Sequence, residues 1–113
     1  MDQASEKIVL IEHDGPSRES LQSALQSAGH FVASFATSRE GLEFVHQTGA
    51  DLLILDLAPG DSTAHEALAA IRGAAATESL RVLCIVSGGP TERAVALNLG
   101  ADDAISHPLD SAE

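Results

Sequence analysis

Short apolar runs alternate along the chain with longer stretches in which apolar residues recur at helical spacing. The apolar runs are too short for buried helices and are bounded by polar or turn-forming residues, so they predict strands. Their positions are 8–11, 31–35, 52–56, 81–86 and 103–106. The stretches between them are amphipathic and predict helices. These helices are expected at about 17–28, 37–49, 63–73 and 91–99.

The predicted helices carry start and stop signals. Thr37-Ser38-Arg39-Glu40 and Thr63-Ala64-His65-Glu66 both have the spacing of a capping box, which opens a helix. Gly29, Gly49 and Gly100 each follow a predicted helix, at a position where glycine commonly ends one. The pattern of apolar residues and the local signals therefore agree on where the helices lie.

The alternation of strands and helices predicts an α/β domain. The connections are too long for hairpins, so the strands should run parallel in a doubly wound sheet, with right-handed crossovers and helices on both faces. The run 31–35 is less apolar and alternates with polar positions, as expected for an edge strand. The sequence stops at Glu113, where a further helix would normally cover part of one sheet face. We therefore expect a final helix that is missing or truncated, with a longer native chain or a partner covering that face.

Composition and charge narrow the classes of function. With 113 residues the chain is expected to form one domain, residues 1–113, as a fragment of a longer protein. Its formal charge of −11 repels phosphate backbones and anionic lipids, so we expect no direct binding of nucleic acid or membranes. The N-terminus is acidic, no apolar stretch is long enough to span a membrane, and the single Cys84 cannot form an internal disulfide. These features predict a cytoplasmic protein.

Polar side chains follow four of the predicted strands, and the most informative is Asp56 at the end of the third. An ionised carboxylate is costly to bury without partners, so Asp56 should lie at the open end of its strand. Glu12-His13-Asp14, Ser87 and His107 come at the ends of the first, fourth and fifth strands. Ligands of open parallel sheets bind at the carboxyl ends of the strands, so these groups are expected to converge on Asp56.

These residues resemble the receiver domains of two-component response regulators. Glu12-His13 matches the acidic pair after the first strand of that family, and Asp56 matches its phosphoacceptor. Ser87 matches the hydroxyl residue after the fourth strand, and His107-Pro108 matches the Lys-Pro after the fifth. Residues 99–103, Leu-Gly-Ala-Asp-Asp, look like the run before the family's fifth strand. The resemblance extends over nearly the whole chain.

The resemblance implies a chemotaxis-type, flavodoxin-like fold with five parallel strands in the order 2-1-3-4-5. It implies that Asp56 accepts a phosphoryl group from a histidine kinase or a phosphotransfer protein in a phosphorelay. Such a domain is a signalling module rather than an enzyme, and it passes its signal to an output domain or a partner protein. The expected missing final helix is a separate reason to expect self-association, as a homodimer formed through the uncovered sheet face.

The resemblance also implies roles for the site residues. Glu12, Asp56 and the backbone carbonyl of Ala58 would hold Mg²⁺, a hard ion that prefers oxygen ligands. Ser87 and His107 would each donate a hydrogen bond to an oxygen of the transferred phosphoryl group. Asp56, Ser87 and His107 are therefore the expected catalytic residues.

Several positions depart from the family pattern. His13 stands where the family usually places a carboxylate ligand of Mg²⁺, and imidazole suits that ion poorly. Asp14 is one residue away, but the geometry at the end of a strand is expected to aim it elsewhere. His107 replaces a lysine and brings no fixed charge. Ala104 replaces the aromatic residue that usually reports phosphorylation, and Pro59 falls one residue early in its loop.

These departures leave two other functions open. One is a pseudo-receiver, a protein-interaction module whose surface is recognised regardless of phosphorylation. The other is a flavodoxin-like domain that binds a metal or small ligand, with His13 and His107 beside the two carboxylates Glu12 and Asp56. No Gly-x-Gly-x-x-Gly follows the first strand, so the sequence does not support a flavin or dinucleotide version of that function.

Overall fold

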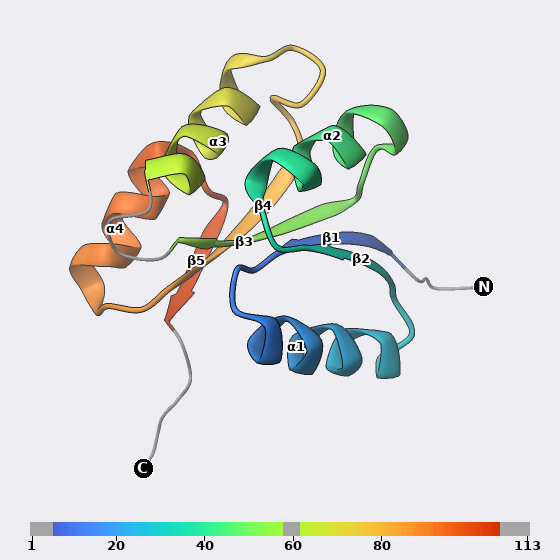
Figure 1. The fold of residues 1–113 in the computed structure, drawn as a ribbon. Helices are drawn as coiled ribbons and strands as arrows, with labels where there is room; N and C mark the ends of the chain where they lie inside the picture. The colour runs from blue at the N-terminus through green and yellow to red at the C-terminus, as the bar shows by residue number, and fades with distance from the viewer. Residues whose placement is uncertain (1–5, 58–61, 107–113) are drawn as a thin grey trace.

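The computed structural model describes residues 6–57 and 62–106. In this part of the chain strands and helices alternate without exception (Figure 1). The elements are β1 (Lys7–Ile11), α1 (Gly15–Ser27), β2 (Phe31–Phe35), α2 (Ser38–Thr48), β3 (Leu52–Leu57), α3 (Ser62–Gly73), β4 (Arg81–Val86), α4 (Pro90–Leu99) and β5 (Asp103–Ser106). None of the helices described is long and apolar enough to cross a membrane.

The strands form one parallel sheet in the order β2-β1-β3-β4-β5. The order reverses between β1 and β3, because the chain first adds β2 on one side and then returns to build the other side. Ile11 pairs with Leu55, and Asp56 pairs with Ile85. The predicted fold class, a doubly wound sheet in the order 2-1-3-4-5, is therefore confirmed. The predicted missing or truncated final helix concerns residues outside the described part.

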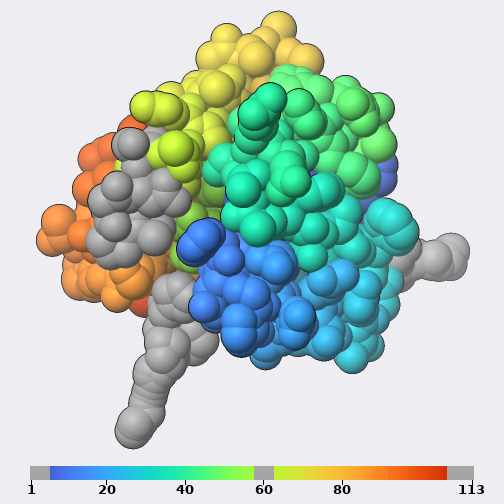
Figure 2. Space-filling model, viewed as in Figure 1, coloured from blue at the N-terminus to red at the C-terminus, as the bar shows by residue number. Residues whose placement is uncertain are grey.

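The helices divide between the two faces of the sheet (Figure 1). Of the helices in the described part, α2, α3 and α4 pack on one face and α1 packs on the other. Successive side chains of β1 point to opposite faces of the sheet, because a strand is pleated. Val9 and Ile11 join the core under α2–α4, while Ile8 and Leu10 join the core under α1. In the space-filling view the helices form most of the visible surface (Figure 2).

The core beneath α2–α4 is built mainly of aliphatic side chains. Leu53, Leu55 and Leu68 are completely buried in it. Cys84 lies among them, and burial raises the pKa of its thiol to about 12, so it packs as a small apolar side chain. On the opposite face the cover is thinner, because no residue of α1 is fully buried. Ile105 of β5, on the same face, is 46% exposed and is not covered by any helix of the described part.

Helix boundaries follow local chemistry. Thr37 caps α2 as predicted, since its hydroxyl oxygen accepts the N–H of Glu40 at 3.2 Å and its hydroxyl donates to the Glu40 carboxylate at 3.1 Å. The second predicted capping box is wrong, because α3 begins at Ser62 and Thr63 lies within its first turn. The two sequence patterns have the same spacing, so spacing alone does not distinguish a cap from a residue inside the helix.

The side chain of Arg72, near the end of α3, makes hydrogen bonds that link α3 to the connections before β4 and β5. Its guanidinium donates to the carbonyl oxygens of Leu80 at 2.6 Å, Gly100 at 2.7 Å and Glu78 at 3.0 Å. It also pairs with the Asp102 carboxylate at 2.9 Å, and the same carboxylate oxygen accepts the N–H of Val82. The connections before β4 and β5 are thus held in place from one side chain, which positions the strands that reach the site.

Candidate functional site

The carboxyl edge of the sheet carries the predicted site. Asp56 is the second-last residue of β3 and is half-buried, since the strand continues to the buried Leu57. It lines a cavity of about 130 Å³. His13, in the loop after β1, and Thr63, in the first turn of α3, line the same cavity. The structure therefore brings Asp56 and His13 together, as predicted from their positions at neighbouring strand ends.

Glu12 is held in a buried position directly after β1. Its side chain and backbone together are only 2% exposed. Its N–H donates to the carbonyl of Phe35 at 3.0 Å, and its own carbonyl accepts the guanidinium of Arg18 at 2.8 Å. One carboxylate oxygen, Oε2, accepts the N–H of Asp14 at 3.0 Å. These contacts fix the turn that carries His13 toward the cavity.

Asp14 points away from this site and caps α1 instead. Its Oδ2 accepts the N–H of Ser17 at 2.9 Å. Hydrogen bonds from the side chain and then the backbone of Ser17 lower the pKa of Asp14 below its ordinary value. The expectation that Asp14 would be aimed elsewhere is confirmed.

Ser87 lies at the same edge, in the loop directly after β4. It is exposed, and it does not line the cavity at Asp56. The register places Val86 opposite Leu57, so Ser87 begins one residue beyond the end of β3. The loop is tied to β5, because the Ser106 hydroxyl donates to the carbonyl of Gly88 at 2.9 Å.

Only part of the predicted metal site falls within the described residues. Glu12 and Asp56 supply carboxylate oxygens, which suit Mg²⁺. Ala58, whose carbonyl completes the predicted ligand set, lies outside the described residues, as do Pro59, His107 and Pro108. Across 6–57 and 62–106, no group of three or more His, Cys, Asp and Glu side chains is arranged to hold a metal ion. The metal-binding alternative needs both His13 and His107. Only His13 falls within the described residues, so the structure does not test this pair.

Sequence reasoning missed two parts of the cavity wall. Thr63 lines the cavity from α3, and residues 36–38 line it from the connection between β2 and α2 and from the first residue of α2. Thr63 was interpreted as a helix cap, which hid its place at the site. Its position offered a usable signal, because it opens the helix that follows Asp56 and must begin at the same edge of the sheet.

Comparison with curated proteins finds transcriptional regulators. The chain is 29% identical to the transcriptional regulatory protein AfsQ1 of Streptomyces coelicolor, over 90% of this chain and 44% of that protein. It is 27% identical to the regulatory protein VanRc of Enterococcus gallinarum, over 96% of this chain and 46% of that protein. The chain thus spans less than half the length of these relatives.

Comparison with solved structures finds the same fold. A putative response regulator from Chloroflexus aurantiacus superposes with a TM-score of 0.86 at 21% identity, covering 95% of this chain and 88% of that one. The chemotaxis protein CheY4 of Vibrio cholerae superposes with a TM-score of 0.82 at 22% identity, covering 95% and 90%. A Mn²⁺-bound form of the response regulator Rcp1 has a TM-score of 0.78 at 16% identity, covering 93% and 83%.

The match to a family covers nearly the whole sequence. Residues 8–113 match the response regulator receiver domain, and this span includes the strand ends that carry Glu12, Asp56 and Ser87. The order of the strands and the position of the cavity at their carboxyl edge agree with that match. The chain belongs to the response regulator receiver domain family.

Proposed function

We propose that this domain accepts a phosphoryl group on the carboxylate of Asp56, from a histidine kinase or a phosphotransfer protein. The observation that carries the proposal is the half-buried Asp56, which lines a cavity at the carboxyl edge of the sheet of a receiver domain. A carboxylate oxygen of Asp56 attacks phosphorus, the bond from phosphorus to the donor nitrogen breaks, and an acyl phosphate forms. Positioning and neutralisation of charge are the main tasks left to the protein.

The neighbouring side chains have proposed roles in this step. Glu12 and Asp56, with the carbonyl of Ala58, would hold Mg²⁺, which supplies positive charge next to the phosphoryl oxygens when it is bound. Ser87 would donate its hydroxyl to one phosphoryl oxygen, and His107 would donate an imidazole N–H to another. Because His13 occupies the position of a carboxylate ligand, we propose that Mg²⁺ binds weakly.

A mass measurement tests phosphoryl acceptance. The chain is incubated with acetyl phosphate or phosphoramidate and Mg²⁺ or Mn²⁺, and intact mass is recorded. We expect the added mass of one phosphoryl group, which Asp56→Asn abolishes. Asp51→Asn is the matched control, since Asp51 precedes the same strand at the opposite edge of the sheet. No adduct on a folded chain with either metal would overturn the proposal.

A pseudo-receiver is the second candidate, and the position of His13 favours it. The imidazole lines the cavity at Asp56 where the family usually has a metal-binding carboxylate. Under this function, partner binding would be the same for the wild-type chain and for Asp56→Asn. A partner that binds more tightly only after treatment with a phosphodonor would exclude it.

The partners follow from the proposed role. The relatives are transcriptional regulators more than twice as long as this chain, so we propose that the signal passes to an output domain or a partner protein. A shift between two surface conformations would carry it. Self-association as a homodimer stays a prediction, supported by the exposed Ile105 on the thinly covered sheet face.

A further inference from the structure

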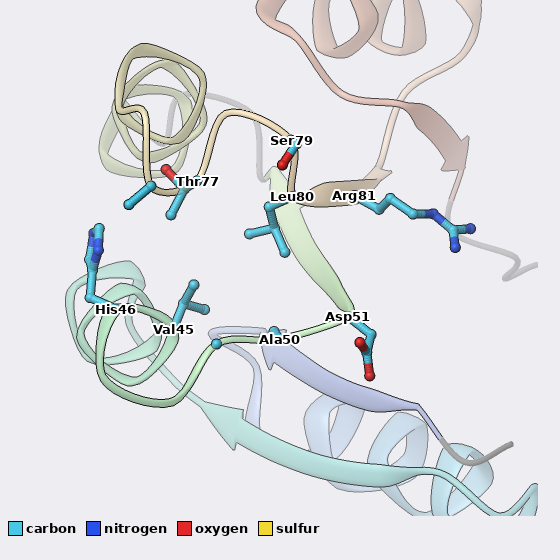
Figure 3. Close-up of a pocket in the computed structure, with 10 residues that line it drawn as sticks. Val45, His46, Ala50, Asp51, Thr77, Ser79, Leu80 and Arg81 are labelled. Atoms are coloured by element: carbon cyan, nitrogen blue, oxygen red, sulfur yellow. The ribbon is translucent and has the colours of Figure 1, made fainter.

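A larger cavity lies at the amino edge of the sheet, opposite the edge that carries Asp56 (Figure 3). Its volume is about 430 Å³, within the range of sites that bind small molecules. The end of α2, the short connection to β3 and the connection between α3 and β4 enclose it. Among the described residues assigned to phosphoryl acceptance, Glu12, Asp56 and Ser87 do not line this cavity.

The floor of the cavity is apolar. Val45 is 5% exposed, and Leu80 and Ala50 are half-buried beside it. Figure 3 shows the side chains of Val45 and Leu80 directed into the same space from α2 and from the segment before β4. A ligand with an apolar body would remove this surface from water, at a gain proportional to the area covered.

The rim is polar and its side chains are available. His46 stands at one side of the cavity, and Arg81 stands at the other side with its side chain extended outward (Figure 3). Ser79 lies between them along the connection that leads to β4. Within the described part of the chain, the side chains of His46, Ser79 and Arg81 make no hydrogen bond or ion pair. The rim therefore offers an imidazole, a hydroxyl and a guanidinium.

Some acceptors at or near the rim already accept hydrogen bonds. One carboxylate oxygen of Asp51 accepts the N–H of Lys7 at 2.7 Å. At the end of α2 the carbonyl of Thr48 accepts the Lys7 ammonium at 2.7 Å, and the carbonyl of Val45 accepts the N–H of Gly49 at 2.7 Å. These contacts engage part of the acceptor capacity near the rim, whereas an anion meets three donor side chains that have no partner in the described residues.

We propose that this cavity binds a small organic monoanion with an apolar body and one carboxylate. The body would lie on Val45, Ala50 and Leu80, and the carboxylate would leave the cavity toward Arg81. A guanidinium presents two parallel N–H groups that match a carboxylate, and its four-bond stem can turn toward the ligand. The site is separate from Asp56 and gives the domain a second input that does not pass through phosphorylation.

The test uses phenylbutyrate as the probe, with phenylbutanol and phenylbutylamine as neutral and cationic analogues. Methyl resonances of Val45 and Leu80 are followed by NMR during titration, and affinity is measured by calorimetry. We expect saturable shifts with phenylbutyrate, and binding about tenfold weaker for Arg81→Gln, the factor expected from losing one charge-assisted hydrogen bond. Arg39→Gln is the matched control, because Arg39 lies at the other end of α2 and does not line this cavity.

Three results would overturn the proposal. They are the absence of saturable shifts, equal affinity for the amine and the carboxylate, and unchanged affinity in Arg81→Gln. If Arg81→Gln is poorly folded, Arg81→Lys replaces it, since it keeps the charge but loses the paired N–H groups. Affinity of Arg81→Lys equal to that of the wild-type chain would then count against carboxylate recognition.

Discussion

At the scale of single residues, the three side chains of residues 12–14, directly after β1, have different roles. Glu12 is buried and accepts the N–H of Asp14, while Asp14 caps α1 through Ser17. His13, between them, is the residue of this segment that lines the cavity at Asp56. The identity of this one side chain should therefore decide how well a metal ion binds beside Asp56.

We predict that His13→Asp increases Mg²⁺ affinity. A carboxylate at this position adds a hard oxygen ligand and a negative charge, so binding should tighten by about tenfold or more. Calorimetric titration with Mg²⁺ measures the change, and His46→Asp, at the opposite edge of the sheet, serves as the control. An unchanged Mg²⁺ affinity in His13→Asp would show that His13 is not the cause of weak Mg²⁺ binding. The segment that contains Pro59 would then be the next candidate.

A second residue-scale prediction concerns pH. The pKa of Asp14 in the folded chain lies below its ordinary value of 3.8, so its charged form contributes stability above that value. This contribution is lost as the pH falls through the lowered folded pKa. The stability of the wild-type chain relative to Asp14→Asn, measured by urea unfolding, should therefore decrease between about pH 5 and pH 2. The decrease should be smaller in a Ser17→Ala background, and an equal decrease there would refute the assigned cause.

At the scale of elements, the sequence determined strands well because each buried strand is a short apolar run between turn residues. The bounds of β2, β4 and β5 agree with the prediction. Helix starts were harder, since Thr37 and Thr63 present the same spacing and only Thr37 is a cap. For the site, the strand ends could be placed at one edge from topology alone. The contribution of Thr63 to the cavity wall depends on how α3 packs against the sheet, and the spacing of residues in the sequence does not reveal that packing.

Close packing between α2 and β1 gives an element-scale prediction. Gly41 is buried in α2, and a Cβ there would collide with the side chain of Ile11. Gly41→Ala should therefore destabilise the chain by about 1 to 3 kcal/mol, despite the better helix propensity of alanine. Gly73→Ala is the control, since a Cβ at Gly73 meets nothing within 4 Å. Equal urea midpoints for the two variants would contradict this packing.

The Arg72 contacts give another prediction at this scale. Arg72→Lys keeps the charge but cannot reach the carbonyls of Leu80, Glu78 and Gly100 together. We expect a loss of about 2 kcal/mol in the free energy of unfolding, because three carbonyl oxygens in the connections before β4 and β5 lose their donor. Arg93→Lys should cost less, since the side chain of Arg93 donates one hydrogen bond within the described residues, to the carbonyl of Ala104. A larger loss in Arg93→Lys than in Arg72→Lys would refute the role of Arg72.

At the scale of the whole molecule, the parallel sheet separates two possible inputs. Every strand runs from the edge that carries the larger cavity to the edge that carries Asp56. Strands β3 and β4 connect the two directly, from Asp51 and Arg81 at one end to Asp56 and Ser87 at the other. A ligand at the amino edge and a phosphoryl group at the carboxyl edge would thus act on the same two strands, without competing for the same surface.

Net charge gives the last prediction, which belongs to the whole molecule. The chain carries 17 Asp and Glu against 6 Lys and Arg, so most of its carboxylates cannot be paired with a Lys or Arg side chain of their own. Repulsion among excess carboxylates opposes the compact state, and salt screens it over a distance of about 10 Å at 0.1 M. Raising NaCl from about 0.02 M to about 0.2 M should therefore raise the urea midpoint. KCl should act equally, and a midpoint that falls with both salts would show that local attractive pairs outweigh the net charge.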